Sequence, residues 1–441
     1  KKKKNPHKEP ERFTGVRLMA LAPVTVEVAF QKGITEDAQD SDFTTISTDN
    51  PIREFQIVRG RKGELSTTQA GRAVIICSNA NGKLDPSNTS SGSPYYVSAS
   101  TNVIPMRHVR VKATDPATST TYVIFRGFVE KWVQEYPHEK DQVTRLECVD
   151  AFKALSLARC DGTSESQELS GLRVANLLDQ AQWIGSGSGS TSVSGYRDID
   201  NDSNNQTIPA KTYAVTEDVL LQCQQIETAE IGSFFVSRSG VMTFLNRLNR
   251  VSQFASISAT FSDTSTSGGR VKYNRLNFES EDLSIINRID TVISSGSSGT
   301  QKNNTDSQTK FGIRSLTQGD LLLTSTSEAD SWAEYNIGRL ANPANRVQSI
   351  KLIPQEQDAL WAVVLQAELG NAYVIERTPS AGNAISSTVI VERILHKGRG
   401  ASWTTEFELS PADTAGYWTL DDGSGTYSAF SELGNTTRLF F

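Results

Sequence analysis

Apolar and polar residues alternate along the first third of the chain. Val24, Val26, Val28 and Phe30 are each separated by one polar or small residue, which is the period expected of a strand with one buried face. Further strand-like runs occupy residues 55–58, 72–77, 108–113, 121–133 and 142–150, and no helical pattern separates them. Such a series favours an antiparallel barrel or sandwich, so we predict a first β-barrel domain over residues 16–155.

The spacing of apolar residues becomes helical beyond this domain. Residues 170–182 place their apolar side chains on one face of a helix that Ser170 can cap, and a second helix is expected from Thr216. Ser239-Gly240 then has the composition of a hairpin turn between two short strands. These elements predict an α+β insertion domain over residues 156–261.

Strand patterns return in the last part of the chain. They occupy residues 276–294, 347–353, 372–376, 387–395 and 403–409, with a turn at 396–400 and one helix over 327–342. We predict a second β-rich domain over residues 262–410, in which residues 262–309 could instead complete the first barrel. Residues 411–441 are expected to form a C-terminal extension. The predicted fold class is therefore mainly β with an α+β insertion: two β-barrel domains and a smaller α+β domain.

Composition excludes several classes of protein. The 441 residues carry 44 basic and 50 acidic side chains, a formal charge of -6, and only residues 1–15 concentrate basic ones, in an arm that we expect to be flexible. A dedicated nucleic-acid binder usually has a basic face, so that class is disfavoured. No apolar run approaches the ~20 residues of a membrane span, and no signal peptide is recognised. The four cysteines are widely spaced, which favours buried free thiols in a protein made in the cytoplasm.

The sequence contains no recognisable catalytic constellation. Its four histidines, His7, His108, His138 and His396, include no H-x-x-x-H pair of the kind that binds zinc. No G-x-S-x-G elbow lies between a strand and a helix, and no P-loop is present. We therefore predict that the chain is not an enzyme, that it uses no cofactor, and that it has no catalytic residues.

One acidic stretch is a candidate calcium site. Asp198, Asp200 and Asp202 alternate along the chain, and carboxylate oxygens in such a pattern can surround a calcium ion. An EF-hand loop that began at Asp198 would need glycine at its sixth position and glutamate at its twelfth, where Ser203 and Pro209 stand. A solvated loop without metal is the alternative interpretation.

Residues 53–96 form the most distinctive stretch of the sequence. A short strand runs into the basic turn Arg59-Gly60-Arg61, where glycine permits a sharp reversal, and a buried strand follows at residues 72–77. Residues 84–96 contain two prolines and many small polar residues, so we expect an ordered excursion from the sheet. We predict an exposed connection that contacts a neighbouring subunit through Arg59, Arg61, Glu64, Leu84, Asp85, Tyr95 and Tyr96. Contacts of the two arginines with an anion or DNA are the alternative.

Four motifs in this region occur in a specific order. They are R-G-R-x-x-E-L at 59–65, A-G-x-A at 70–73, G-x-L-D-P-x-N-x-S-S-P-Y at 82–95 with one additional glycine, and F-x-G-x-V at 125–129. Later motifs occupy 311–314, 369–374, 391–396, 403–411 and 418–422. In this order they resemble the minor tail, or baseplate hub, proteins of long-tailed bacteriophages. The resemblance covers about four fifths of the chain and is weakest at the N-terminus and over residues 185–215.

This resemblance implies a structural virion protein at the distal end of a phage tail. Hub relatives are trimers whose two barrel domains form a pseudo-sixfold ring around the DNA exit channel. The implied partners are the tail tube, distal tail and tape-measure proteins on one side and tail fibre or tip proteins on the other. DNA would be met only in transit, and the protein would be assembled in the host cytoplasm.

Three alternatives remain open from the sequence. The chain could form a hexameric distal tail ring, or it could be a tail lysin or protease, although no nucleophile or metal set supports an enzyme. It could also be a receptor- or carbohydrate-binding tail module. In that case Trp403, Tyr417 and Trp418 are candidates for a surface on which a sugar stacks.

Overall fold

The computed structural model describes residues 22–412, apart from 64–65, 99, 139–140, 186–188, 254–255, 265, 280–284 and 343–345. Strands dominate this part of the chain, and its largest element is a sheet of 13 strands, so the mainly β class predicted from the sequence is confirmed. The predicted basic arm and nearly all of the predicted C-terminal extension lie outside the described residues. No helix within the described residues is long and apolar enough to cross a membrane.

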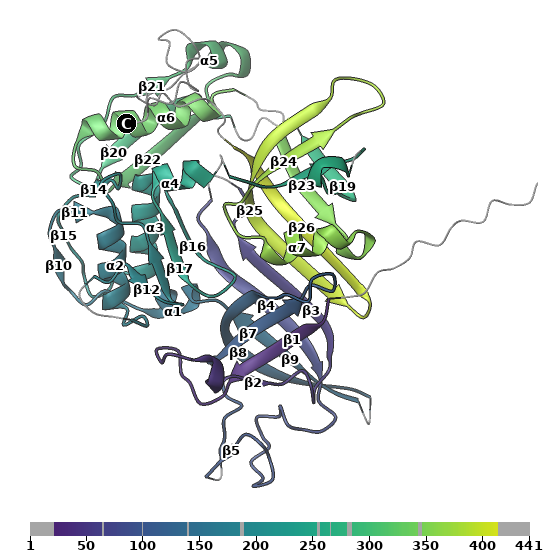
Figure 1. Cartoon of the computed structure of the whole chain (residues 1–441). Helices are drawn as coiled ribbons and strands as arrows, with labels where there is room; N and C mark the ends of the chain where they lie inside the picture. Colours follow the sequence, from purple (N-terminus) through teal and green to yellow (C-terminus); the bar gives the residue numbers. More distant parts are fainter. Residues whose placement is uncertain are drawn as a thin grey trace, which may run out of the picture.

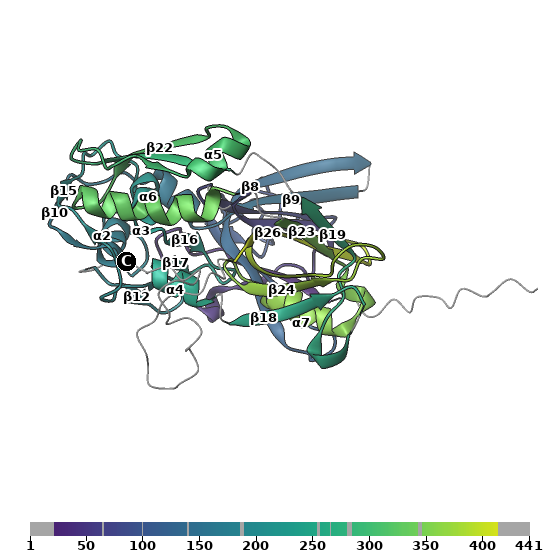
Figure 2. The same cartoon turned by 90° about the horizontal axis from the view of Figure 1, so that it is seen from above.

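The N-terminal strands form one half of the large sheet, in the lower part of Figure 1. All neighbours are antiparallel, as the alternating sequence pattern predicts. In sheet order the strands are β2 (Thr44–Thr45), β1 (Val24–Ala29), β7 (Arg107–Thr114), β8 (Thr121–His138), β9 (Asp141–Val149), β4 (Gln69–Ser78) and β3 (Ile52–Gly60). Their inward side chains, such as Val26, Ile75 and Phe125, share one hydrophobic core. Figure 2 shows β8 and β9 projecting beyond this core as a long hairpin.

The C-terminal strands form the other half of the sheet. They are β25 (Ile385–Arg399), β26 (Ser402–Pro411), β23 (Arg346–Leu352) and β19 (Arg275–Glu279), with β24 (Ala372–Arg377) and β18 (Ile257–Ser262) branching from β25. Side chains such as Ile350, Tyr373 and Phe407 fill a second core. The 3-10 turn η4 (Pro354–Glu356) and helix α7 (Asp358–Gln366) follow β23, and Trp361 of α7 reaches the core of the first half.

The two halves are joined edge to edge by β3 and β25. These strands pair antiparallel from Arg393↔Gly60 to Arg399↔Glu54, so 13 strands form one continuous sheet. The strand order is open from β19 to β2, and no pairing between described strands closes either half. Where two β-barrel domains were predicted, the described strands form two half-sheets that share a seam and contain no closed barrel.

The predicted insertion is an α+β unit on one side of the sheet (Figure 1). Its helices are α1 (Phe152–Leu157), α2 (Ser170–Gln180), α3 (Val219–Glu230) and α4 (Arg247–Ser252). A small sheet contains β12 (Ser192–Val193), β13 (Arg197–Ile199), β17 (Met242–Leu245) and β16 (Ser233–Val236). Two further sheets have two short strands each. One pairs β10 (Ser164–Glu165) with β15 (Lys211–Thr212), and the other pairs β11 (Glu168–Leu169) with β14 (Thr207–Ile208). The hairpin predicted around Ser239-Gly240 is confirmed as β16 and β17.

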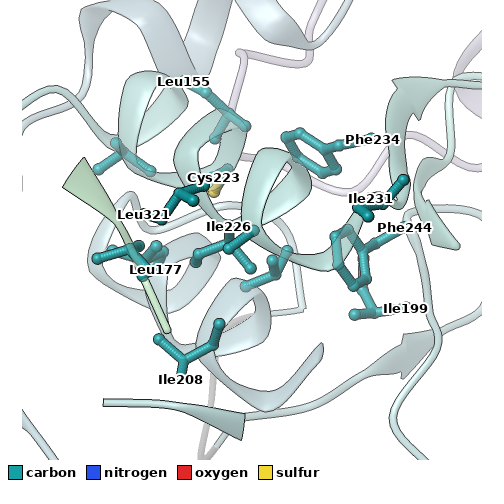
Figure 3. Packing of buried hydrophobic residues seen from close by; sticks show 14 of the residues in the cluster. Leu155, Leu177, Ile199, Ile208, Cys223, Ile226, Ile231, Phe234, Phe244 and Leu321 are labelled. Atoms are coloured by element: carbon teal, nitrogen blue, oxygen red, sulfur yellow. The ribbon is translucent and has the colours of Figure 1, made fainter. Parts of the chain in front are cut away.

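A later segment packs against this unit and shares its core. It contains β20 (Arg288–Ile293), β21 (Lys302–Asn303), α5 (Thr305–Phe311), β22 (Ser315–Leu321) and α6 (Thr326–Leu340). Figure 3 shows Leu321 of β22 beside Leu177 of α2 and Cys223 of α3, and all three belong to the same buried cluster. The predicted limits at residues 156, 261 and 410 stay predictions, but this core groups residues 286–341 with the insertion.

Several local expectations were wrong for identifiable reasons. The strand expected over 276–294 is two strands, β19 and β20, that belong to different sheets. The turn expected at 396–400 continues as strand to Arg399, because β25 is paired there on both sides. Ser170 does not cap α2, since Leu169 is the N-cap and the Ser170 hydroxyl donates to Glu230. Asp218, and not Thr216, begins α3 by accepting from a backbone N–H.

Candidate functional site: a buried arginine junction and an exposed excursion

The arginine turn lies at the seam between the two half-sheets. Gly60 adopts φ of 98°, and a side chain there would collide with the carbonyl oxygen of Glu392, so only glycine fits this close approach. The backbone N–H of Arg61 donates to that same oxygen over 2.9 Å. The register of β25 against β26 shifts around Glu392, and such a bulge can redirect a side chain.

Both arginines of the turn are buried inside the chain. Arg59 is 3% exposed and Arg61 is 8% exposed. The exposed turn predicted from the sequence is therefore wrong at these two positions. Glu64, the third member of the predicted turn, lies outside the described residues. Burial of a guanidinium group requires partners, and the chain supplies them.

Five side chains form what we call the arginine junction: Arg59, Arg61, Glu227, Glu368 and Glu392. The Nε of Arg61 donates to Glu392 over 2.6 Å, and its Nη1 lies 3.7 Å from Glu227 on α3. Arg59 forms an ion pair with Glu368, whose other oxygen accepts the backbone N–H of Arg238 in the β16–β17 turn over 2.8 Å. The junction thus connects β3, β25 and the insertion.

The two carboxylates around Arg61 have pKa values shifted in opposite directions. Burial raises the pKa of a carboxyl group, but at Glu392 the nearby Arg61 and Arg250 outweigh burial and lower the pKa to about 2. At Glu227 burial outweighs the attraction of Arg61, and the pKa is raised. The two pKa shifts differ because Glu392 accepts a 2.6 Å hydrogen bond from Arg61, whereas Glu227 lies 3.7 Å from the guanidinium. A cavity of about 140 Å³ adjoins Arg61, Glu227 and Arg250.

The excursion predicted at residues 84–96 belongs to the longer segment 79–106 between β4 and β7, which extends below the N-terminal strands around β5 (Tyr96–Val97) in Figure 1. Asn79 fixes its start, because the side-chain oxygen accepts the backbone N–H of Leu84 over 3.1 Å. Leu84 is fully buried in the core, so its side chain is not on the surface. Asp85, Tyr95 and Tyr96 retain partial exposure, and their contact with a neighbouring subunit stays a prediction.

The calcium candidate is organised as a loop by its own hydrogen bonds. Asp200 accepts the backbone N–H of Asn246 over 2.9 Å, and Asp202 accepts the backbone N–H of Asn204 over 2.8 Å. Asp198 lies on β13, which runs parallel to β17. Within the described ranges no group of three or more His, Cys, Asp or Glu side chains could hold a metal ion. The arrangement therefore favours the loop interpretation.

The four cysteines, His396 and Trp403 have side chains that could perform chemistry or bind a ligand, and all of them are buried. The four cysteines are buried free thiols, as predicted, and burial raises the pKa of Cys77 to about 12. His396 is fully enclosed, burial lowers its pKa to about 3, and its Nδ1 lies 2.9 Å from the hydroxyl of Thr405. Trp403 is 0% exposed and packs against Phe55 and Trp361, so the alternative of a sugar-stacking surface does not hold at Trp403. Its other two members, Tyr417 and Trp418, lie outside the described residues.

Sequence reasoning missed the acidic partners of the two arginines. One signal was available, because Glu392 directly follows the apolar run Val389, Ile390 and Val391. A carboxylate at the end of such a run is rarely buried unless a cation pairs with it. No comparable signal identified Glu368, which lies in a loop far along the chain.

Two tail proteins are among the solved structures to which this chain is similar. The tail protein from Neisseria meningitidis MC58 has 9% sequence identity and a TM-score of 0.55, over 89% of this chain and 96% of that one. The 43 kDa tail protein of prophage MuSo2 from Shewanella oneidensis has 8% identity and a TM-score of 0.53, over 89% and 98%. No protein-family model and no curated protein sequence matches the chain. At these identities the likeness establishes the fold alone, and the chain has the fold of these tail proteins.

Proposed function

We propose that this chain is a structural protein of a phage tail and forms the hub at its distal end. The observation that supports the proposal is the pair of half-sheets joined by β3 and β25, in a fold shared with two tail proteins over most of the chain. Three copies with two half-sheets each would supply six half-sheets. That number suits an adaptor between a sixfold tube and a threefold tip.

The position and partners are part of the same proposal. The hub would join the tail tube and distal ring to the tip or fibres, with DNA passing through its centre only in transit. Mechanical load would then pass between the sheet and the insertion through the arginine junction. Asp85 and Tyr96, which keep partial exposure on the excursion, are proposed to contact the neighbouring subunit.

Stoichiometry and symmetry test the proposal directly. Light scattering on the purified chain is expected to give about three times the 48.2 kDa of one chain. Electron microscopy of the intact tail is expected to place three copies around the axis at the distal end. Six copies in that ring would support the distal tail ring instead. Absence of the chain from the distal tail in the reconstruction would contradict both roles.

A further inference from the structure

A groove of about 410 Å³ lies between the excursion and the loop that follows β1. Ligand sites commonly have volumes of about 300–1,000 Å³. Its walls come from Phe30 and Gln31 after β1, from β2 and the loop around it, and from Pro94 to Val97 on the excursion. The strands that line it, β2 and β5 (Tyr96–Val97), have two residues each, so they offer little edge for an extended peptide.

One wall of the groove is a rigid stack of aromatic rings. Tyr95 stacks on Phe30 with ring centroids 3.8 Å apart, and Phe30 stacks on Trp132 of β8 at 6.0 Å. The backbone carbonyl of Tyr95 accepts the N–H of Asn102 over 2.9 Å, and β5 pairs with β6 (Ser100–Thr101). Tyr95 is therefore fixed on the core and needs no rearrangement to present its ring.

The opposite wall carries hydroxyl and amide groups that are free to bind a ligand. Gln31, Ser41, Thr44 and Thr45 are exposed, and no described residue forms a hydrogen bond with any of their side chains. The hydroxyl of Tyr95 likewise has no partner among the described residues, and burial together with Asp49 raises the pKa of Tyr95 to about 12, so it remains a donor. Side chains of these types can both donate and accept.

The charges that border the groove cancel. Asp42 lies 3.8 Å from Lys32, and Asp49 forms a 2.6 Å ion pair with Lys83. An anionic or cationic ligand would have to displace one of these partners. A neutral ligand with an apolar face and a rim of hydroxyl groups matches the lining without such a cost.

We propose that this groove binds a neutral oligosaccharide. One sugar ring would stack its C–H face on Tyr95, and its hydroxyls would bond with Gln31, Ser41 and one of the two threonines of β2, whose successive side chains point to opposite faces of the strand. This assignment competes with the prediction that Tyr95 contacts a neighbouring subunit. It goes beyond the proposed tail role and does not depend on it, because binding is measured on the purified chain.

The test uses an array of neutral and acidic bacterial oligosaccharides, followed by calorimetry with the strongest ligand. We expect a neutral oligosaccharide to bind. The double variant Thr44→Val, Thr45→Val keeps the side-chain shapes and removes whichever threonine hydroxyl faces the ligand, so it should weaken binding about fivefold, because one hydroxyl contact of about 1 kcal/mol is lost. Tyr95→Ala should abolish measurable binding, and Tyr95→Phe should retain part of it.

Tyr136→Ala is the matched control, since this tyrosine is 65% exposed on the projecting hairpin and does not line the groove. It should bind as the parent protein does. Circular dichroism checks that each variant is folded, and the valine variant leaves the aromatic stack intact. The inference is overturned if no neutral oligosaccharide binds, or if binding survives both groove variants. It is also overturned if the groove variants change only the oligomeric state.

Discussion

Replacing Arg61 by methionine tests the arginine junction most sharply. The side chain of Arg61 is 9% exposed and pairs with Glu392 at 2.6 Å and with Glu227 at 3.7 Å, and the side chains of both glutamates are 6% exposed. Removing one partner of a buried ion pair costs about 3–5 kcal/mol, because the other charge is left uncompensated. Arg250 still attracts Glu392, so we expect the lower end of that range, about 3 kcal/mol.

Urea unfolding of Arg61→Met, Glu392→Gln and the double variant measures this cost. The double variant leaves no unpaired charge at Glu392, so it should be less destabilised than the sum of the single variants. The expected coupling free energy is about 2 kcal/mol, within the range found for residues in direct contact.

The same variants predict a change in the acid dependence of stability. The pKa of Glu392 is lowered from 4.5 to about 2, so its contribution is fully present above 4.5 and is lost as the pH falls towards 2. Without Arg61 the folded-state pKa of Glu392 should rise. The free energy of unfolding of Arg61→Met should therefore fall less steeply between pH 4.5 and pH 2 than that of the parent protein.

Arg53→Met provides the matched control, because Arg53 lies on β3 and Arg61 directly follows that strand. Arg53 pairs with Asp141 at the surface, where the two side chains are 40% and 34% exposed. Such pairs contribute about 1 kcal/mol or less. If Arg61→Met costs no more than Arg53→Met, or if the double-variant cycle shows no coupling, the junction does not stabilise the fold as argued.

Three further predictions address the sheet, a helix cap and the histidines. Gly127→Ala would place a Cβ 2.2 Å from a carbonyl oxygen of β9 and should cost about 1–3 kcal/mol in urea unfolding. Gly92→Ala, with open space around it, should cost almost nothing. Equal effects of the two substitutions on the free energy of unfolding would refute the steric argument. Asp218→Ala removes the N-cap of α3 and should cost about 1 kcal/mol in thermal unfolding. Asp218→Asn can still accept the capping hydrogen bond and should retain most of the stability. Equal losses in the two variants would contradict the capping role of Asp218. Burial lowers the pKa of His108 to about 4 and of His396 to about 3, below the unfolded value of 6.5, so stability should decline as pH falls from 6.5 to 4. A double His→Gln variant should show a shallower decline, and an unchanged slope would exclude this cause.

Patterns between neighbouring residues were predictable from the sequence. Ser239-Gly240 lies between two apolar runs, and the hairpin there depends on little else. The alternation of Val24, Val26 and Val28 likewise identifies β1, because burial of one face of a sheet imposes that period. The helix predicted over residues 327–342 forms as α6, since its capping residues lie within the first turn.

Contacts between distant parts of the chain were not predictable in this way. Arg61 and Glu392 are 331 positions apart, and nothing near Arg61 indicates that β25 will lie beside β3. A basic turn with glycine is typical of an exposed loop, so local rules place both arginines at the surface. The groove was not predictable from local patterns either, because Phe30 and Tyr95 are far apart in the sequence and meet only in the folded chain.

The insertion contacts the large sheet at the seam between the two half-sheets, and Arg61 connects all three parts there. Arg61 directly follows β3, which joins the two half-sheets, and its side chain binds Glu392 of β25 and Glu227 of α3. Any movement of the insertion relative to the sheet must therefore separate buried opposite charges, which is costly in a low-dielectric interior. In the proposed hub, load would pass between the sheet and the insertion, and this resistance would lie where they meet. The burial of Arg59 and Arg61 gives the turn a structural role within the chain, in place of the exposed contact that its sequence suggests.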